Sequence, residues 1–416
     1  MINDDFYYTS LCYYWKPHKE FILKHYNSFG TGGKFDINIC RLLGHNMLSP
    51  RAGEWSLPWR VDVIPNFAMP EYDPAFNKSF AEITDDVAKQ LQYVINKTGR
   101  PLMLFYSGGI DSVVSLVALL KNLSPIELSM VHLNMSMDSI IENPLFYKRF
   151  IENKFTIHNS DTFDYSKSID VGYLPITLDQ GDAMFGTELG TKMYAKYDEL
   201  LNYVSESSRS HLTKIYKDLS NAERHYSEYK DLLIAYFALP QFGDFGYNEE
   251  FGKLFYEKLV RNIESVKVPV NSLHDFFWWM IFNVKYMHCA VRGAIYYGAE
   301  EDIERSIQGR IFNWFNVADY QKWSMANNNN GEKIAGTTQI KYKWAAKQYI
   351  YDFDKNDWYL NYKTKIGSLR NIWVRNFLRM EGLFALDKNY KVLQINDPEV
   401  EKFAVEKLQE YKIDWV

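Results

Sequence analysis

Residues 101–122 read PLMLFYSGGIDSVVSLVALLKN and contain the clearest fold signal in the sequence. The short apolar run 101–106 (PLMLFY) is typical of a buried strand, and the run that begins at Val113 (VVSLVALLKN) indicates a helix despite its β-branched start. The turn SGGIDS, residues 107–112, joins the two. A strand followed directly by a helix predicts one unit of an α/β sheet.

Two further apolar runs, residues 126–133 and 171–178, follow at the spacing of one crossover each. Strand, helix and strand at this spacing predict a parallel sheet with right-handed crossovers. Helical periodicity over residues 81–96 predicts a helix that leads into the first strand. Because ligands of parallel sheets bind at the carboxyl ends of the strands, the polar clusters after residues 106 and 178 are the expected places for a site.

Three regions are expected along the chain. Residues 1–95 form an N-terminal region of uncertain fold, and residues 96–377 form the α/β domain, which becomes mostly helical from about residue 205. Residues 378–416 are expected to form a hairpin and a helix, because hydrophobicity alternates over 383–395 and Asp397-Pro398 then gives an N-cap followed by a proline.

The turn SGGIDS has the chemistry of an anion site. Gly108 and Gly109 let the backbone approach a ligand closely, because neither carries a Cβ atom. The N–H groups of the turn and of the first helical residues converge on one point, where a phosphate is favoured. Ser107 and Ser112 add hydroxyl donors. Asp111 by itself repels phosphate, so its presence suggests a Mg²⁺ ion that bridges the carboxylate and the phosphate oxygens.

The pattern S-G-G-x-D-S resembles the signature of the N-type ATP pyrophosphatases, known as the PP-loop, whereas the Walker pattern G-x-x-x-x-G-K-[ST] does not occur in the chain. The resemblance implies an adenine nucleotide α-hydrolase-like fold that binds ATP and Mg²⁺ and cleaves ATP to AMP and pyrophosphate. It implies that Ser107, Gly108, Gly109, Asp111 and Ser112 bind ATP, and that Asp111 also binds the metal.

Within that superfamily, the segment 178–186 (LDQGDAMFG) is similar to the G-E-G-x-D-E-[LV]-F-G segment of asparagine synthetases. By this resemblance Asp182 is the second magnesium ligand, and Asp179 stands where the family carries a catalytic glutamate at the reacting centre. The segment departs from the family at Ala183, which replaces the second acid of D-E, and Asp179 is shorter than glutamate. The resemblance covers roughly residues 80–375.

A third segment, residues 359–365 (YLNYKTK), follows Lys343 and Lys347. It resembles the late part of the asparagine synthetase domain, where a basic R-x-K step places a lysine on pyrophosphate. Lys365 matches that lysine as a catalytic residue, and Lys363 matches the arginine before it as an ATP ligand. A cation there would stabilise the charge that develops on the leaving pyrophosphate.

Typical asparagine synthetases carry a glutaminase domain whose cysteine nucleophile follows the initiator methionine. Here the second residue is Ile2 and the first cysteine is Cys12, so residues 1–95 are expected not to hydrolyse glutamine. The favoured function is a ligase that adenylates a small-molecule or peptide carboxylate for capture by ammonia or an amine. Two alternatives stay open, a PP-loop enzyme that modifies a nucleobase or tRNA and a catalytically degenerate nucleotide-binding protein.

Composition restricts the partners and the location. The formal net charge is −5 and no basic run of five or more residues occurs, so the usual footprint of a nucleic-acid-binding protein is missing. The most apolar stretch, residues 276–291, is interrupted by Asn283, Lys285 and His288, which predicts a buried core helix in place of a membrane span. The chain opens without a signal-peptide pattern, and the expected location is cytoplasmic.

Overall fold

The computed structural model describes residues 50–55, 67–160, 162–163, 165–186, 193, 196–215, 224–239, 247–286, 311–326, 343–363, 384–386 and 392–395. The chain divides into two compact units, which are described separately. The sheet unit comprises Asn77–Leu178, Arg310–Asp319 and Gly331–Val416. The helical unit comprises Met1–Phe76, Asp179–Gly309 and Tyr320–Asn330.

The sheet unit contains a five-stranded sheet of spatial order β3-β2-β1-β4-β5, in which neighbouring strands are parallel. Leu102 of the central strand pairs with Val131 on one side and with Leu174 on the other. The segment after β1 therefore emerges from the middle of the sheet, and the expected α/β class is confirmed. The strands are β1 (Leu102–Phe105), β2 (Val131–Met135), β3 (Thr156–Asn159), β4 (Leu174–Thr177) and β5 (Phe312–Asn313).

The strands differ in extent from the apolar runs that predict them. The run 126–133 begins with a helical turn, α6 (Pro125–Leu128), because the Ser124 side chain accepts the N–H of Glu127 as an N-cap and a proline follows at the first helical position. The strand itself starts only at Val131. Neither β3 nor β5 follows from the hydrophobic pattern, since β3 is largely exposed and β5 has two residues.

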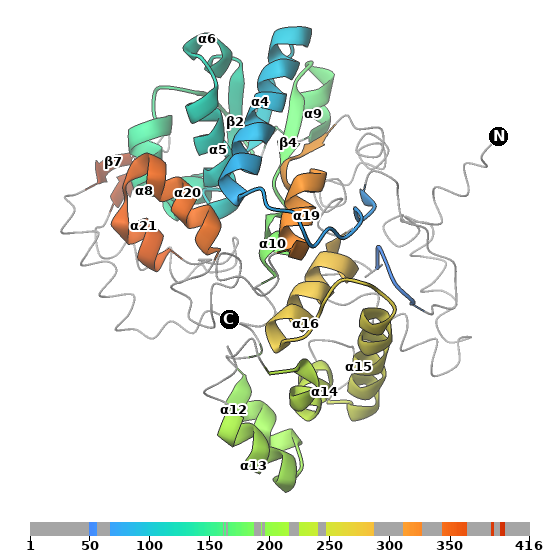
Figure 1. The fold of residues 1–416 in the computed structure, drawn as a ribbon. Helices are drawn as coiled ribbons and strands as arrows, with labels where there is room; N and C mark the ends of the chain where they lie inside the picture. The colour runs from blue at the N-terminus through green and yellow to red at the C-terminus, as the bar shows by residue number, and fades with distance from the viewer. Residues whose placement is uncertain are drawn as a thin grey trace, which may run out of the picture. The chain divides into compact units, whose positions relative to one another are not determined.

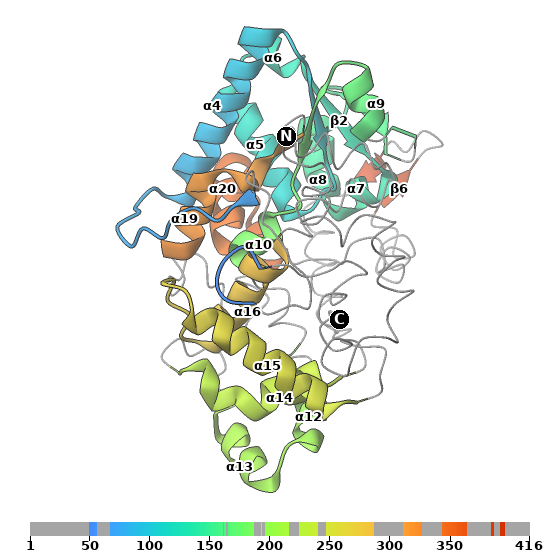
Figure 2. The same cartoon turned by 90° about the vertical axis from the view of Figure 1, so that its right-hand side faces the viewer.

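Helices cover both faces of the sheet. In Figure 2, α4 (Phe80–Thr98) and α5 (Ile110–Asn122) lie on one face and α9 (Tyr165–Asp170) lies on the other. Both α4 and α20 (Trp344–Asp354) pack against α5 (Figure 1). Because it is enclosed by the sheet and two helices, α5 is buried along most of its length, which explains why its sequence is apolar on all sides.

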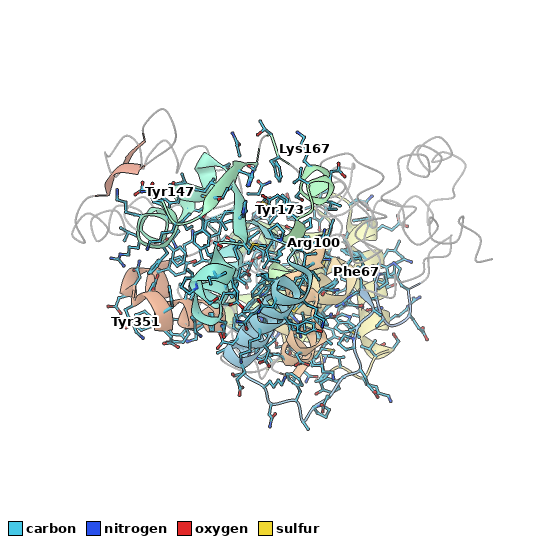
Figure 3. All side chains as sticks on the ribbon, turned by 90° about the horizontal axis from the view of Figure 1, so that it is seen from above. Phe67, Arg100, Tyr147, Lys167, Tyr173 and Tyr351 are labelled. Atoms are coloured by element: carbon cyan, nitrogen blue, oxygen red, sulfur yellow. The ribbon has the colours of Figure 1, made fainter. Side chains whose placement is uncertain are left out.

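An arginine just before β1 forms hydrogen bonds with the segment just before the neighbouring strand β4. Arg100 lies just before β1, and its guanidinium donates to the carbonyl oxygen of Gly172 at 3.0 Å and to that of Tyr173. Figure 3 shows Arg100 and Tyr173 close together at this end of the sheet. The hydrogen bonds add to the parallel pairing of β1 with β4, by which both strands end at the same edge of the sheet.

Short helices and a two-stranded ladder complete the described part of the sheet unit. β6 (Phe384–Leu386) pairs antiparallel with β7 (Val392–Ile395). The helices are α7 (Met137–Glu142), α8 (Pro144–Phe146), a π-helical turn (Tyr147–Ile151), a 3-10 turn (Trp314–Asn316) and α21 (Asp357–Tyr362).

The helical unit is built around aromatic side chains. Trp278 and Trp279 of α16 (Leu273–Trp279) are fully buried, and the helix continues as a π-helical turn, Met280–Val284. The amide of Asn283 donates to Ala52 O at 3.0 Å and to Asn262 Oδ1 at 2.8 Å, which satisfies a polar side chain inside this core. The helices are α10 (Gly181–Phe185), α12 (Tyr197–Leu200), α13 (Glu206–Ile215), α14 (Lys230–Phe237), α15 (Glu249–Glu264) and α16 (Leu273–Trp279), with α19 (Ala318–Ala326) contributing from Tyr320.

The stretch 276–291 is a buried segment as far as the structure describes it, and the predicted core helix is confirmed up to Tyr286. Among the described helices, none combines the length and the apolar composition that crossing a membrane requires.

Candidate functional site

The loop after β1 presents backbone donors at the start of α5. Gly109 is the N-cap residue of α5, and because it has no side chain it makes no capping hydrogen bond to the first N–H groups of the helix. Ser107 is exposed, and its Oγ accepts the N–H of Gly109 and lies 3.3 Å from Ser112 Oγ. The Ser112 hydroxyl in turn donates to Gly109 O at 2.9 Å. N–H groups at such a helix start can bind an anion, so the anion site stays a prediction that this geometry permits.

Gly108 is required for the shape of this loop. Its φ is 75°, in the left-handed region, and a Cβ atom at this position would lie 2.1 Å from Ser139 O and 2.7 Å from Glu142 Cβ. The loop therefore packs directly on α7, and only glycine fits between them. This contact also brings Glu142, at the end of α7, next to the loop.

The carboxylate of Asp111 is held by a lysine from a distant part of the chain. Asp111 lies in the first turn of α5, and Lys343 Nζ lies 2.8 Å from its Oδ1 and 2.5 Å from its Oδ2. Lys343 is the N-cap residue of α20, and its side chain is 2% exposed. Because α20 packs on α5, the ammonium of Lys343 lies beside the first turn of α5.

A second ion pair adjoins the loop. Lys363 Nζ lies 2.5 Å from Glu142 Oε2 and 3.0 Å from Glu142 O, with the lysine side chain 1% and the glutamate side chain 19% exposed. The structure thus places Lys363, one of the predicted ATP ligands, against α7, which itself contacts Gly108.

A third lysine lies in the same cluster and carries no stable positive charge. Lys347 is fully buried, and its Nζ donates to Lys363 O at 3.3 Å. Burial, and secondarily the positive charge of Lys363, lower the pKa of Lys347 to about 7. The cluster therefore holds two paired ammonium groups, Lys343 with Asp111 and Lys363 with Glu142, and a third lysine that can gain a proton near neutral pH.

Two phenol hydroxyl groups complete the polar interior of this region. The hydroxyls of Tyr106 and Tyr359 are buried and have no hydrogen-bond partner among the described residues. Burial raises the pKa of each phenol, so both remain neutral donors. Buried hydroxyls of this kind are ordinarily satisfied by water or by a ligand.

The remaining predicted site residues fall in three places. Asp179 follows β4, and Asp182 lies in α10, where its carbonyl accepts the N–H of Gly186 at 2.9 Å. Both aspartates belong to the helical unit, whereas the loop belongs to the sheet unit, so a magnesium ion shared by Asp111 and Asp182 stays a prediction. Lys365 lies outside the described residues.

A magnesium ion fits this site only together with phosphate. Within the described ranges, no group of three or more His, Cys, Asp or Glu side chains could hold a metal ion. Asp111 is the carboxylate at the loop that could bind Mg²⁺, and phosphate oxygens and water would supply further ligands, as is usual for this ion.

The unusual state of Lys347 gives a testable prediction about stability. Its folded pKa of about 7 lies below the ordinary value of 10.5, so between these two pH values the unfolded chain binds a proton that the folded chain does not. The contribution of Lys347 to the free energy of unfolding therefore rises with pH, by at most about 1.4 kcal/mol per pH unit. Lys347→Met should be more stable than the wild type at pH 7, and this advantage should shrink towards pH 10.

Urea unfolding of both proteins at pH 7, 8 and 9 checks this result, and Lys355→Met serves as the control because Lys355 is an exposed lysine at the other end of α20. Parallel curves for the wild type and Lys347→Met would show that Lys347 stays protonated in the folded state.

Five residues of this cluster have no role predicted from the sequence: Tyr106, Glu142, Lys343, Lys347 and Tyr359. Glu142 belongs to no recognisable motif, and its place beside the loop follows only from the close approach of α7 to Gly108.

Comparison of the chain with protein-family models, with curated proteins and with solved structures finds no match.

Proposed function

We propose that this chain binds ATP with Mg²⁺ at the loop of residues 107–112 and cleaves it to AMP and pyrophosphate. The observation that carries the proposal is the uncapped N-terminus of α5, which opens on a glycine turn beside three buried lysines. Backbone N–H groups and ammonium groups in a region of low dielectric bind polyphosphate strongly. The S-G-G-x-D-S pattern supports the same reading.

The proposed reaction is the adenylation of a carboxylate. The substrate carboxylate attacks the α-phosphorus of ATP, the bond from that phosphorus to the β-phosphate oxygen breaks, and pyrophosphate leaves. Ammonia or an amine then attacks the acyl carbon of the adenylate and releases AMP. This reaction type rests on the resemblance of residues 178–186 and 359–365 to asparagine synthetases, with Asp179 at the reacting centre.

The chain's own residues would act mainly on the leaving group. The loop N–H groups orient the β- and γ-phosphates, and Lys363 and Lys365 neutralise the charge that develops on pyrophosphate. Asp111 would hold Mg²⁺, which when bound would draw negative charge from the phosphate oxygens. The neutral hydroxyls of Tyr106 and Tyr359 can donate hydrogen bonds without adding charge.

Binding of ATP tests the location of the site. Ser107 is exposed, so Ser107→Glu should leave the fold intact while it places a carboxylate among the phosphate donors. Ser129→Glu is the matched control, because Ser129 is an exposed serine of the same unit at the end of α6.

Calorimetry at millimolar ATP and Mg²⁺ should give a Kd below about 1 mM for the wild type and for Ser129→Glu, the range usual for enzyme substrates. Ser107→Glu should bind ATP at least about tenfold more weakly, since like charges at close range repel. Absence of ATP binding by the wild type would contradict the proposal. Equal ATP affinity in the two variants would mean that ATP binds away from the loop of residues 107–112.

A further inference from the structure

The ammonium of Lys343 occupies the carboxylate of Asp111 that the proposed Mg²⁺ would bind. The ammonium lies within 2.8 Å of both carboxylate oxygens and is buried, so it already neutralises the group that the proposed Mg²⁺ would use. A divalent cation on these oxygens would lie within a few ångströms of the ammonium. Two positive groups at that range repel each other strongly where water is largely excluded.

The backbone of Lys343 restricts where its ammonium can go. The residue adopts the left-handed conformation at φ 48° and ψ 49°, caps α20, and accepts the N–H of Lys347 at its carbonyl oxygen. The backbone is thereby fixed beside α5, and only the side chain can turn. From that position it can turn from the Asp111 carboxylate towards an anion bound at the N-terminus of α5, one residue away from Asp111.

The charges of the cluster also oppose binding of a metal ion without phosphate. Before any ligand binds, the carboxylates of Asp111 and Glu142 are each paired with a buried ammonium, so a free metal ion would add two positive charges where the carboxylate charge is already neutralised. A bound polyphosphate reverses this balance, because it brings negative charge for the lysines and oxygen ligands for the metal.

We infer that Lys343 is a tethered counter-ion of Asp111, which keeps metal ions off this carboxylate until a polyphosphate at the loop draws the ammonium away. This inference rests on the proposed function and deepens it. Binding of the polyphosphate then strengthens binding of the metal, because it draws the ammonium away from the Asp111 carboxylate. By linkage, the bound metal strengthens binding of the polyphosphate to the same extent. Lys343 is a positioning residue in this scheme, acting on the metal through Asp111.

Binding of Mn²⁺, followed by its electron paramagnetic resonance signal, tests the inference without any turnover. The wild type should bind Mn²⁺ weakly, and added pyrophosphate should tighten binding beyond what the Mn²⁺–pyrophosphate complex accounts for. Lys343→Met should bind Mn²⁺ alone at least about tenfold more tightly than the wild type, because the competing charge is gone. Asp111→Asn in the Lys343→Met background should abolish that gain.

Lys355→Met is the matched control. Lys355 also adopts the left-handed conformation at an end of α20, but its side chain is 65% exposed, so its removal should leave Mn²⁺ binding unchanged. Lys343→Gln provides a second neutral variant that can still donate to the carboxylate, and circular dichroism confirms folding in each case.

Equal Mn²⁺ affinity of the wild type and the folded Lys343 variants would overturn the inference, as would a gain that survives Asp111→Asn. If neither variant folds, the wild type decides: Mn²⁺ binding that pyrophosphate leaves unchanged contradicts the inference. Failure of the proposed function has a different signature, because the wild type would then bind no ATP with Mg²⁺ in calorimetry, whatever Mn²⁺ alone does.

Discussion

Gly108→Ala is expected to destabilise the sheet unit by roughly 2–5 kcal/mol, the sum of about 1–2 kcal/mol for a left-handed residue with a Cβ atom and about 1–3 kcal/mol for overpacking. The added methyl group would lie 2.1 Å from the Ser139 carbonyl oxygen, a backbone atom that moves only if α7 moves. Displacement of α7 would also disturb the Glu142–Lys363 pair, so the variant should lose nucleotide binding together with stability.

Gly99→Ala separates the two contributions. Gly99 ends α4 with φ 64°, and a Cβ atom there would meet nothing within 4 Å. Its replacement should therefore cost only the conformational part, about 1–2 kcal/mol. Urea unfolding of the two variants measures the difference. Equal losses for Gly108→Ala and Gly99→Ala would show that α7 does not press on the loop.

Lys363→Met is expected to lower the free energy of unfolding by about 3–5 kcal/mol, the usual cost of removing one partner from a buried ion pair. The lysine side chain is 1% exposed, and its loss leaves the Glu142 carboxylate beside the loop without its ammonium. The same variant should weaken pyrophosphate binding, because the loop then faces an uncompensated negative charge.

A double-mutant cycle with Glu142→Gln measures the pair itself. Glu142→Gln should offset a large part of the loss caused by Lys363→Met, since it removes the stranded charge. The exposed pair Lys253–Glu249, at 2.6 Å, has nearly the same separation as the 2.5 Å of Lys363–Glu142 and provides the control. Its cycle should show little or no coupling. Similar coupling in both cycles would mean that burial does not strengthen the Lys363–Glu142 contact.

The centre of the fold could be predicted because its signals are local. Residues 101–122 contain an apolar strand, a Gly-Gly turn and an apolar helix in direct succession, and the structure has β1 and α5 there. The edge of the sheet carries weaker signals. β3 is exposed along most of its length, and β5 has two residues, so neither produces a periodic pattern that a sequence could reveal.

The candidate site could be predicted only where residues act through the backbone. Gly108 is recognisable because the loop needs a glycine there for its own shape. The ion-pair partner of Asp111 cannot be recognised in the sequence. Lys343 lies 232 residues further along the chain and reaches Asp111 through the packing of α20 on α5. Spacing in a sequence carries no information about which of several lysines such packing selects. The roles of Asp179, Asp182 and Lys365 stay predictions.

The products formed from ATP distinguish cleavage to AMP and pyrophosphate from cleavage to ADP and phosphate. The wild type should be incubated with ATP, Mg²⁺, ammonia or an amine, and a panel of carboxylates, and the nucleotides and phosphates should be separated and counted. The proposal predicts AMP and pyrophosphate in equal amounts, retained by Ser129→Glu and abolished by Ser107→Glu. Formation of ADP and phosphate, or AMP formation that Ser107→Glu leaves unchanged, would contradict cleavage of ATP at this loop.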